Sequence, residues 1–154
     1  MIELDLLSKR EQLQTKQEAD KRYLFDPIRK KWLVMQPEEL VRQLIILYLQ
    51  QEKNYNRNRI RIEMGLQVHE LQKRCDILVY DNQMVPFLLI ECKAPSVAVN
   101  QQTFRQIANY NLPLKVPYLL VSNGRVSYCC KMNYEDRSFE FVTSIPVFPT
   151  NDTL

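Results

Sequence analysis

Residues 73–93 read KRCDILVYDNQMVPFLLIECK, and the fold is decided by this stretch. Two apolar, β-rich runs, 75–80 and 87–92, flank the polar sequence Asp81-Asn82-Gln83. Short apolar runs on either side of a polar turn are typical of a β-hairpin. The stretch therefore predicts two neighbouring strands at the centre of the chain.

Each strand of this hairpin carries one acid, Asp76 in the first and Glu91 in the second, and Lys93 follows two residues later. Because side chains alternate along a strand, Glu91 and Lys93 share one face. The neighbouring strand can add Asp76 to the same place. We therefore expect two carboxylates and an amine close together on one sheet surface.

A long helix is expected before the hairpin. Pro37 suits a first helical position, and Glu38 and Glu39 suit the first turn, where they meet the positive end of the helix dipole. An apolar stripe at helical spacing then continues to about Asn54. This helix-start chemistry explains both acids without any active site.

After the hairpin, Ser96 is expected to cap a second helix over 97–111, which crosses over to a parallel strand. Further strands are expected at 58–64, 118–121, 126–130 and 138–142. Together these elements predict an α/β fold with one mixed central β-sheet of about five strands flanked by helices.

Composition narrows the function classes. The chain has 154 residues, 45% of them hydrophobic, and no apolar run long enough to span a membrane, so we expect a cytoplasmic protein. Its two glycines exclude a glycine-rich phosphate loop. Its four cysteines and one histidine lack zinc-ligand spacing. A net charge of +3 permits a nucleic-acid partner without requiring one.

The N-terminal end differs in composition from the rest. Residues 1–22 are polar and weakly periodic, and they are interpreted as an N-terminal arm, while 23–154 are expected to form a single domain. Further on, Arg57, Arg59 and Arg61 alternate with other residues along a predicted strand. On a strand they would form a basic row that is either solvated or tracks a phosphate backbone.

Two chemical interpretations of Asp76, Glu91 and Lys93 stay open from the residues alone. Close carboxylates repel each other unless a cation lies between them, and Mg²⁺ binds carboxylate oxygens well. Such an ion polarises a phosphoryl oxygen, and a neighbouring ammonium orients water. The other interpretation is an exposed strand end whose charges only guard the sheet edge.

Several short motifs, in this order and spacing, resemble the PD-(D/E)XK nuclease superfamily, and within it the N-terminal domain of the R subunit of type I restriction enzymes. The matches together span about Tyr23 to Tyr128, which is most of the chain. The matching stretches are PEELVRQ at 37–43, RCDI at 74–77, IECKAP at 90–95, QIANY at 106–110 and SNG at 122–124.

The resemblance implies a restriction-endonuclease-like core and a Mg²⁺- or Mn²⁺-dependent endodeoxyribonuclease. It makes Asp76 and Glu91 the metal ligands, Lys93 the residue that assists the attacking water, and Glu38, rather than Glu39, the helix acid. It also makes Gln106 and Tyr110 substrate-positioning residues. The expected partners are DNA and other restriction or repair subunits, with no membrane partner.

The chain departs from the pattern of a whole restriction subunit in its length. No helicase motor motif follows the nuclease module, so a stand-alone domain is expected. The alternative function is a non-catalytic DNA-binding or assembly module that retained the nuclease fold. A third is an interaction protein whose polar arm docks on a partner.

Overall fold

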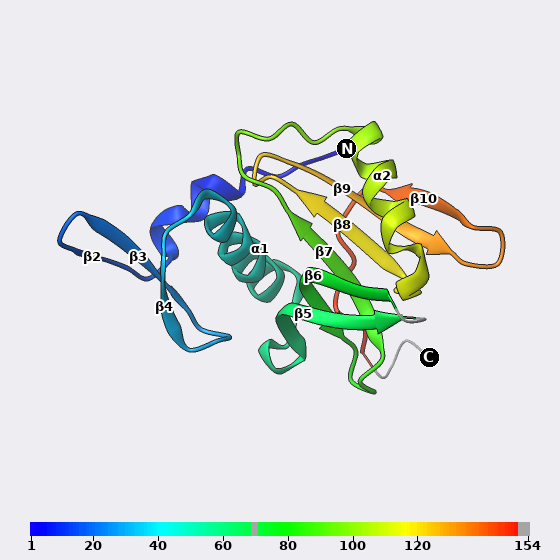
Figure 1. The fold of residues 1–154 in the computed structure, drawn as a ribbon, viewed down its shortest axis with the longest axis horizontal. Helices are drawn as coiled ribbons and strands as arrows, with labels where there is room; N and C mark the ends of the chain where they lie inside the picture. The colour runs from blue at the N-terminus through cyan, green and yellow to red at the C-terminus, as the bar shows by residue number, and fades with distance from the viewer. Residues whose placement is uncertain (69–70, 151–154) are drawn as a thin grey trace.

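The computed structural model describes residues 1–68 and 71–150, apart from the side chains of 63–75, Tyr110 and Pro113. A mixed sheet forms the centre, with one long helix against one face and a shorter helix against the other (Figure 1). The elements are β1 Ile2–Glu3, η1 Leu6–Gln12, β2 Thr15–Glu18, β3 Lys21–Asp26, β4 Lys31–Val34, α1 Pro37–Lys53, η2 Arg57–Arg59, β5 Ile60–Val68, β6 Leu71–Tyr80, β7 Pro86–Cys92, α2 Gln101–Asn111, η3 Leu112–Leu114, β8 Tyr118–Ser122, β9 Val126–Asn133 and β10 Ser138–Val142. Within the described ranges, no helix has the length and apolar character that crossing a membrane requires.

The central sheet confirms the expected α/β class. Its strands follow the order β1-β9-β8-β7-β6-β5, and β10 also pairs with β9. β6 and β7 form the predicted hairpin, and β7 and β8 are parallel, joined by α2 as the crossover. The sheet has seven strands rather than about five. A two-residue strand such as β1 is too short to show an alternating pattern in the sequence.

Helix α1 follows the sequence expectation closely. It begins at Pro37 and ends at Lys53, where Asn54 adopts the left-handed conformation that terminates many helices. Its apolar stripe, including Leu44, Ile45 and Leu49, is fully buried against one sheet face. This packing fixes the first turn of α1, with Glu38 and Glu39, relative to the sheet.

Helix α2 begins later than expected, at Gln101 rather than Val97. Asn100 is the N-cap, and its side-chain oxygen accepts the backbone N–H of Thr103 at 2.9 Å. Ser96 lies in the turn before the helix and does not cap it. Phe104 and Ala108 are fully buried in the second core cluster, between α2 and the other sheet face.

The N-terminal residues are part of the fold and do not stand apart as an arm. Ile2 pairs with Ser127 of β9, and Leu6 is buried in the same core cluster as α1. The boundary expected after residue 22 falls inside β3. Strands β2, β3 and β4 form a separate antiparallel sheet. The contacts of Ile2 and Leu6 are long-range, so a local polar composition gave no sign of them.

Gly124, in the β8–β9 turn, has a φ of +88°, and an added Cβ would lie 3.3 Å from Val41 Cγ2. We expect Gly124→Ala to lower the free energy of unfolding by about 1–2 kcal/mol, through backbone strain and this close contact. Thermal denaturation would measure it. Ala19, exposed at φ +55°, gives the reverse comparison, since Ala19→Gly relieves left-handed strain and should raise the free energy of unfolding by up to about 1 kcal/mol. Equal effects at the two positions would contradict this explanation.

Candidate active site

The hairpin places the predicted acids side by side. The β6–β7 pairing includes Ile77 opposite Ile90, and Asp76 and Glu91 are the next residues along the two strands. Lys93 follows the end of β7, and its backbone N–H donates to Ser122 O of β8 at 2.8 Å. The structure therefore brings the three residues to one place, where β7 ends.

Because Asp76 and Glu91 lie next to the Ile77–Ile90 pair on antiparallel strands, their carboxyl groups project from the same face of the sheet, close enough for the charge of Asp76 to act on Glu91. Asp76 Oδ2 also accepts the backbone N–H of Cys92 at 2.7 Å, and Asp76 Oδ1 lies 3.5 Å from Arg42 Nη2. The two acids consequently face the same space and do not point to opposite sides of the sheet.

The half-buried carboxyl of Glu91 is poorly suited to carry a charge. Burial, followed by the charge and hydrogen bond of Asp76, raises the pKa of Glu91 to about 8, and Glu38 adds to this rise while Lys93 opposes it. At neutral pH the Glu91 carboxyl, beside Asp76, is therefore mostly protonated. Such a pair accommodates a cation well, because a positive charge between the carboxyls removes their repulsion.

The two acids at the start of α1 have different environments. Glu39 is buried, and its carboxylate accepts hydrogen bonds from three side chains, Arg29 at 2.7 Å, Arg42 at 2.7 Å and Gln43 at 3.2 Å. Glu38 is exposed, and its charge is close enough to raise the pKa of Glu91. Glu39 is thus occupied by structural contacts, whereas the role of Glu38 as the helix acid stays a prediction.

Arg42 connects the helix acids to the sheet acids, a role that the sequence motifs did not assign to it. Its guanidinium, only 7% exposed, contacts Glu39 Oε1 at 2.7 Å and Asp76 Oδ1 at 3.5 Å. Burial opposes its charge, but Glu39, Cys92 and Asp76 outweigh burial, and the pKa of Arg42 is raised. The sequence signal that could have identified this role is the position of Arg42, a charged residue within the otherwise apolar stripe of α1.

Cys92 is fully buried beside these charges. Burial, and then the charge of Asp76, raise the pKa of the Cys92 thiol well above its usual value. A neutral thiol is a poor nucleophile and a poor metal ligand. Cys92, Cys129 and Cys130 are free and buried, as expected, and the side chain of Cys75 lies outside the described residues.

The carboxylates of Asp76 and Glu91 supply only part of the ligand set that a hard divalent cation needs. Among the described residues, no group of three or more His, Cys, Asp and Glu side chains is arranged to hold a metal ion. Asp76 and Glu91 would supply two carboxylates, and water would complete the shell. That is a common way for proteins to bind Mg²⁺, which usually keeps several waters.

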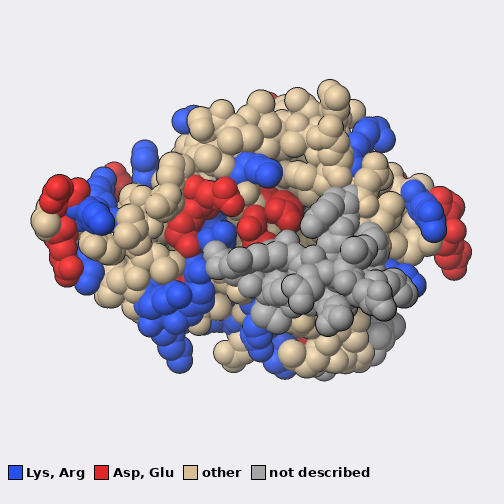
Figure 2. Space-filling model, in the orientation of Figure 1, with Lys and Arg blue, Asp and Glu red and all other residues tan. Residues whose placement is uncertain are grey.

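Figure 2 shows acidic side chains gathered near the centre of one face, over α1 and the neighbouring strands, with basic side chains against them. No other acidic group of this size is visible among the described residues near the centre of that face. The charged group is therefore open to solvent on one side of the molecule.

The two predicted substrate-positioning residues lie on α2. Gln106 is exposed, and no hydrogen bond or ion pair found among the described residues joins it to Asp76, Glu91 or Lys93. The side chain of Tyr110 lies outside the described residues. Their positioning role stays a prediction.

The prediction of an arginine row on a strand is wrong. Arg57 and Arg59 lie in η2, a short 3-10 helix, so only Arg61 is on β5. Arg61 Nη1 donates to its own loop, at Asn58 O (2.8 Å) and Ile60 O (3.2 Å). An Asn56 side chain that caps the 3-10 turn, accepting the Asn58 N–H, breaks the alternation. The three side chains do not form one basic row.

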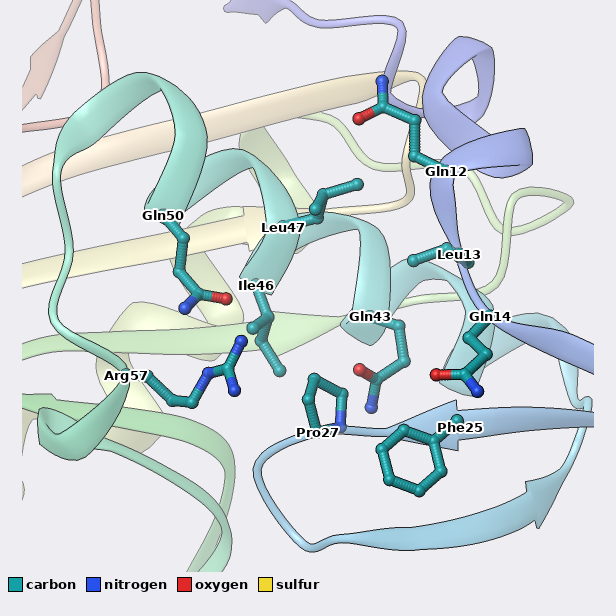
Figure 3. Close-up of a pocket in the computed structure, with 10 residues that line it drawn as sticks. All are labelled: Gln12, Leu13, Gln14, Phe25, Pro27, Gln43, Ile46, Leu47, Gln50 and Arg57. Atoms are coloured by element: carbon teal, nitrogen blue, oxygen red, sulfur yellow. The ribbon is translucent and has the colours of Figure 1, made fainter.

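Arg57 instead lines a pocket of about 390 Å³ between α1 and the N-terminal segments. Figure 3 shows its guanidinium directed toward Ile46 of α1, with Pro27 and Phe25 on the opposite side. None of Asp76, Glu91 and Lys93 lines this pocket. The pocket is thus separate from the acidic group that contains Asp76 and Glu91.

Residues 37–146 match the family model described as "Type I restriction enzyme R protein N terminus (HSDR_N)". The chain belongs to this family. The match covers α1, the central hairpin, Lys93 and α2, so the acidic group described above lies within the HSDR_N region of the chain. No curated protein matches the chain.

Among solved structures, the HSDR_N chain is similar to a fragment of a chain assigned as the HsdR subunit of a type I restriction enzyme from Vibrio vulnificus YJ016. The TM-score is 0.52 at 18% sequence identity, over 73% of this chain and 24% of that chain. At this identity the likeness supports the fold. The chain thus spans about a quarter of the length of that HsdR chain.

The raised pKa of Glu91 predicts a pH-dependent stability. A carboxyl whose pKa is higher in the folded than in the unfolded protein stabilises the fold while protonated, and that contribution is lost as pH rises from about 4.5 to about 8. Glu91→Gln cannot ionise, so its melting temperature relative to wild type should rise between pH 5 and pH 9, on the order of 5 °C. Glu135→Gln, on the exposed β9–β10 turn, is the control. A constant difference across this range would refute the raised pKa of Glu91.

Proposed function

We propose that this HSDR_N domain is a divalent-metal-dependent DNA nuclease that hydrolyses phosphodiester bonds. The observation that carries the proposal is the β6–β7 register, which places Asp76 and Glu91 side by side, with Lys93 and Glu38 close enough for their charges to act on Glu91. The family membership supports the same conclusion, because the motif residues lie within the matched region.

In this mechanism Asp76 and Glu91 would hold Mg²⁺ or Mn²⁺ through their carboxylate oxygens. The bound ion would polarise a phosphoryl oxygen and lower the pKa of a bound water. The Lys93 ammonium orients the water and offsets charge that develops on the phosphate. Glu38 adds a further acid from the first turn of α1, and Gln106 and Tyr110 are assigned to substrate positioning.

Arg42 has a positioning role in this scheme. Its contact with Asp76 Oδ1 and the Cys92 N–H on Oδ2 fix the orientation of the Asp76 carboxylate. Because the contact with Arg42 is long, at 3.5 Å, it is weak, and the Asp76 carboxylate would remain available to a divalent cation.

The experiment is incubation of supercoiled plasmid with the purified domain in Mg²⁺, Mn²⁺ or EDTA, with nicked and linear products resolved on a gel. We expect products with either metal and none in EDTA. Asp76→Asn and Glu91→Gln should each remove the products. An inert wild type, tested across metals and DNA forms, would overturn the proposal.

The second candidate is a non-catalytic DNA-binding or assembly module. One observation favours it, since both carboxylate oxygens of Asp76 already have partners within the protein. Under this alternative the domain binds DNA with the same affinity in EDTA and in Mg²⁺, and no cleavage accompanies binding. Assembly with other restriction or repair subunits belongs to either candidate.

A further inference from the structure

Strands β2, β3 and β4 form a small antiparallel sheet that stands beside the main body (Figure 1). Leu24 and Asp26 are the only buried residues of these three strands, all of which are described. The sheet therefore adds little to the hydrophobic core. It also precedes residue 37, where the family match begins.

This sheet carries the positive charge of the protein. Residues 15–34 include six Lys and Arg and three Asp and Glu, a net +3, which equals the net charge of the whole chain. The rest of the chain is therefore neutral by count. Asp26 is buried and paired with Arg29, so this pair adds no net charge to the surface, on which Glu18 and Asp20 are also exposed. Four basic residues are exposed, Lys21, Arg22, Lys30 and Lys31.

A fifth cation, Lys16, is held in place by aromatic rings and by Glu18, whose Oε1 lies 3.0 Å from Lys16 Nζ. Lys16 Nζ lies 4.5 Å from the ring centroid of Trp32 and 5.8 Å from that of Tyr23. Trp32 in turn packs edge-on against Phe25, with centroids 5.3 Å apart. A cation over aromatic faces is oriented, so it loses less conformational entropy when it binds an anion.

The sheet is connected to the acidic group. Arg29, in the β3–β4 turn, donates through Nη2 to Glu39 Oε1 at 2.7 Å, and Glu39 is the neighbour of Glu38 in α1. Figure 2 shows a group of basic side chains at the lower left, where Figure 1 places the β3–β4 turn. This group is on the same face as the acids. A chain-like polyanion could lie across both.

We propose that the β2–β4 sheet is the docking surface for the sugar–phosphate backbone of DNA, and that it holds the strand that leads to Asp76, Glu91 and Lys93. This inference rests on the proposed function, because it names the surface that brings the nuclease substrate to the site. Repeated phosphates match exposed, spaced cations that carry no base-reading geometry. Binding through this sheet is therefore independent of DNA sequence.

The test compares two quadruple variants of equal charge change. The sheet variant is Lys21→Gln, Arg22→Gln, Lys30→Gln and Lys31→Gln. The control variant neutralises four exposed residues elsewhere, Lys115→Gln, Arg125→Gln, Lys131→Gln and Arg137→Gln. Thermal melting of each protein establishes that both fold.

Binding is measured in EDTA, so that cleavage does not interfere, by fluorescence anisotropy of labelled duplex and single-stranded DNA at about 50–200 mM NaCl. For the sheet variant, we expect affinity at the lowest salt concentration to fall at least about tenfold. The slope of log Kobs against log salt should become shallower by about 0.9 for each phosphate that the variant no longer neutralises. The control should stay within about twofold of wild type, because its cations lie outside the sheet.

The proposal is overturned if the sheet variant keeps the wild-type slope, if the control loses as much affinity, or if wild type does not bind DNA. Cleavage is scored separately on plasmid. A wild type that binds through the sheet but never cuts would refute the nuclease function while preserving the docking surface. If wild type cuts DNA but the sheet variant binds as well as wild type, the docking surface is refuted while the nuclease function is preserved.

Discussion

Lys93→Ala should reduce metal-dependent plasmid cleavage by about 10³-fold while leaving the fold and DNA binding intact. Lys93 is the cation that follows Glu91 at the end of β7, and it opposes the rise of the Glu91 pKa, so its ammonium acts directly on the acid pair. Its loss leaves charge on the reacting phosphate unbalanced. Initial rates of nicking in Mg²⁺ and in Mn²⁺ measure the effect.

Lys115→Ala is the matched control for this change, because Lys115 is exposed and lies outside the acidic group. Cleavage by the control should equal that of wild type. Lys93→Arg keeps the charge but changes its shape, so partial activity is expected. If Lys93→Ala cut DNA at the wild-type rate, the role assigned to Lys93 would be wrong even though the domain is a nuclease.

Arg42→Met should lower the free energy of unfolding by about 3–5 kcal/mol. The substitution keeps much of the side-chain volume but leaves the buried Glu39 without one of its cations and Asp76 without its Arg contact. Removing one member of a buried ion pair costs far more than the pair contributes, because the remaining charge stays desolvated. Chemical denaturation, and a melting temperature lower by about 10 °C, would show the loss.

Lys9→Met provides the comparison for an ion pair at the surface. Lys9 Nζ lies 3.4 Å from Glu52 Oε1, and the Glu52 side chain is 53% exposed. Such a pair contributes between zero and about 1 kcal/mol. Similar losses in the two variants would mean that burial does not govern the Arg42 contacts.

Much of the main framework could be predicted from the sequence because local chemistry determines it. Pro37 and the acids after it mark the start of α1, and the two apolar runs around Asp81 mark the β6–β7 hairpin. Strand alternation then sufficed to predict that Asp76 and Glu91 would meet. No long-range information is needed for these steps, since each rests on residues close together in the chain.

Other features depend on contacts between distant segments. β1 exists because Ile2 pairs with Ser127, far away in the sequence, and Arg42 joins two acids that come from different elements. Arg57 and Arg59 alternate with other residues as a strand would, but the Asn56 cap turns the backbone into a 3-10 helix. In each case a single hydrogen bond or packing contact overrides the local pattern.

The end of the described chain is tied to the C-terminal end of α1. The Phe148 N–H donates to Lys53 O at 3.1 Å, and the Tyr55 hydroxyl donates to Pro146 O at 2.8 Å. Glu38 lies at the opposite end of this helix, about 25 Å away for 17 residues. A fluorophore attached near residue 150 would therefore lie at a fixed distance from the acids, within the range of Förster energy transfer. Energy transfer to labelled DNA would then measure DNA binding at the acids, and the fluorophore would not obstruct them.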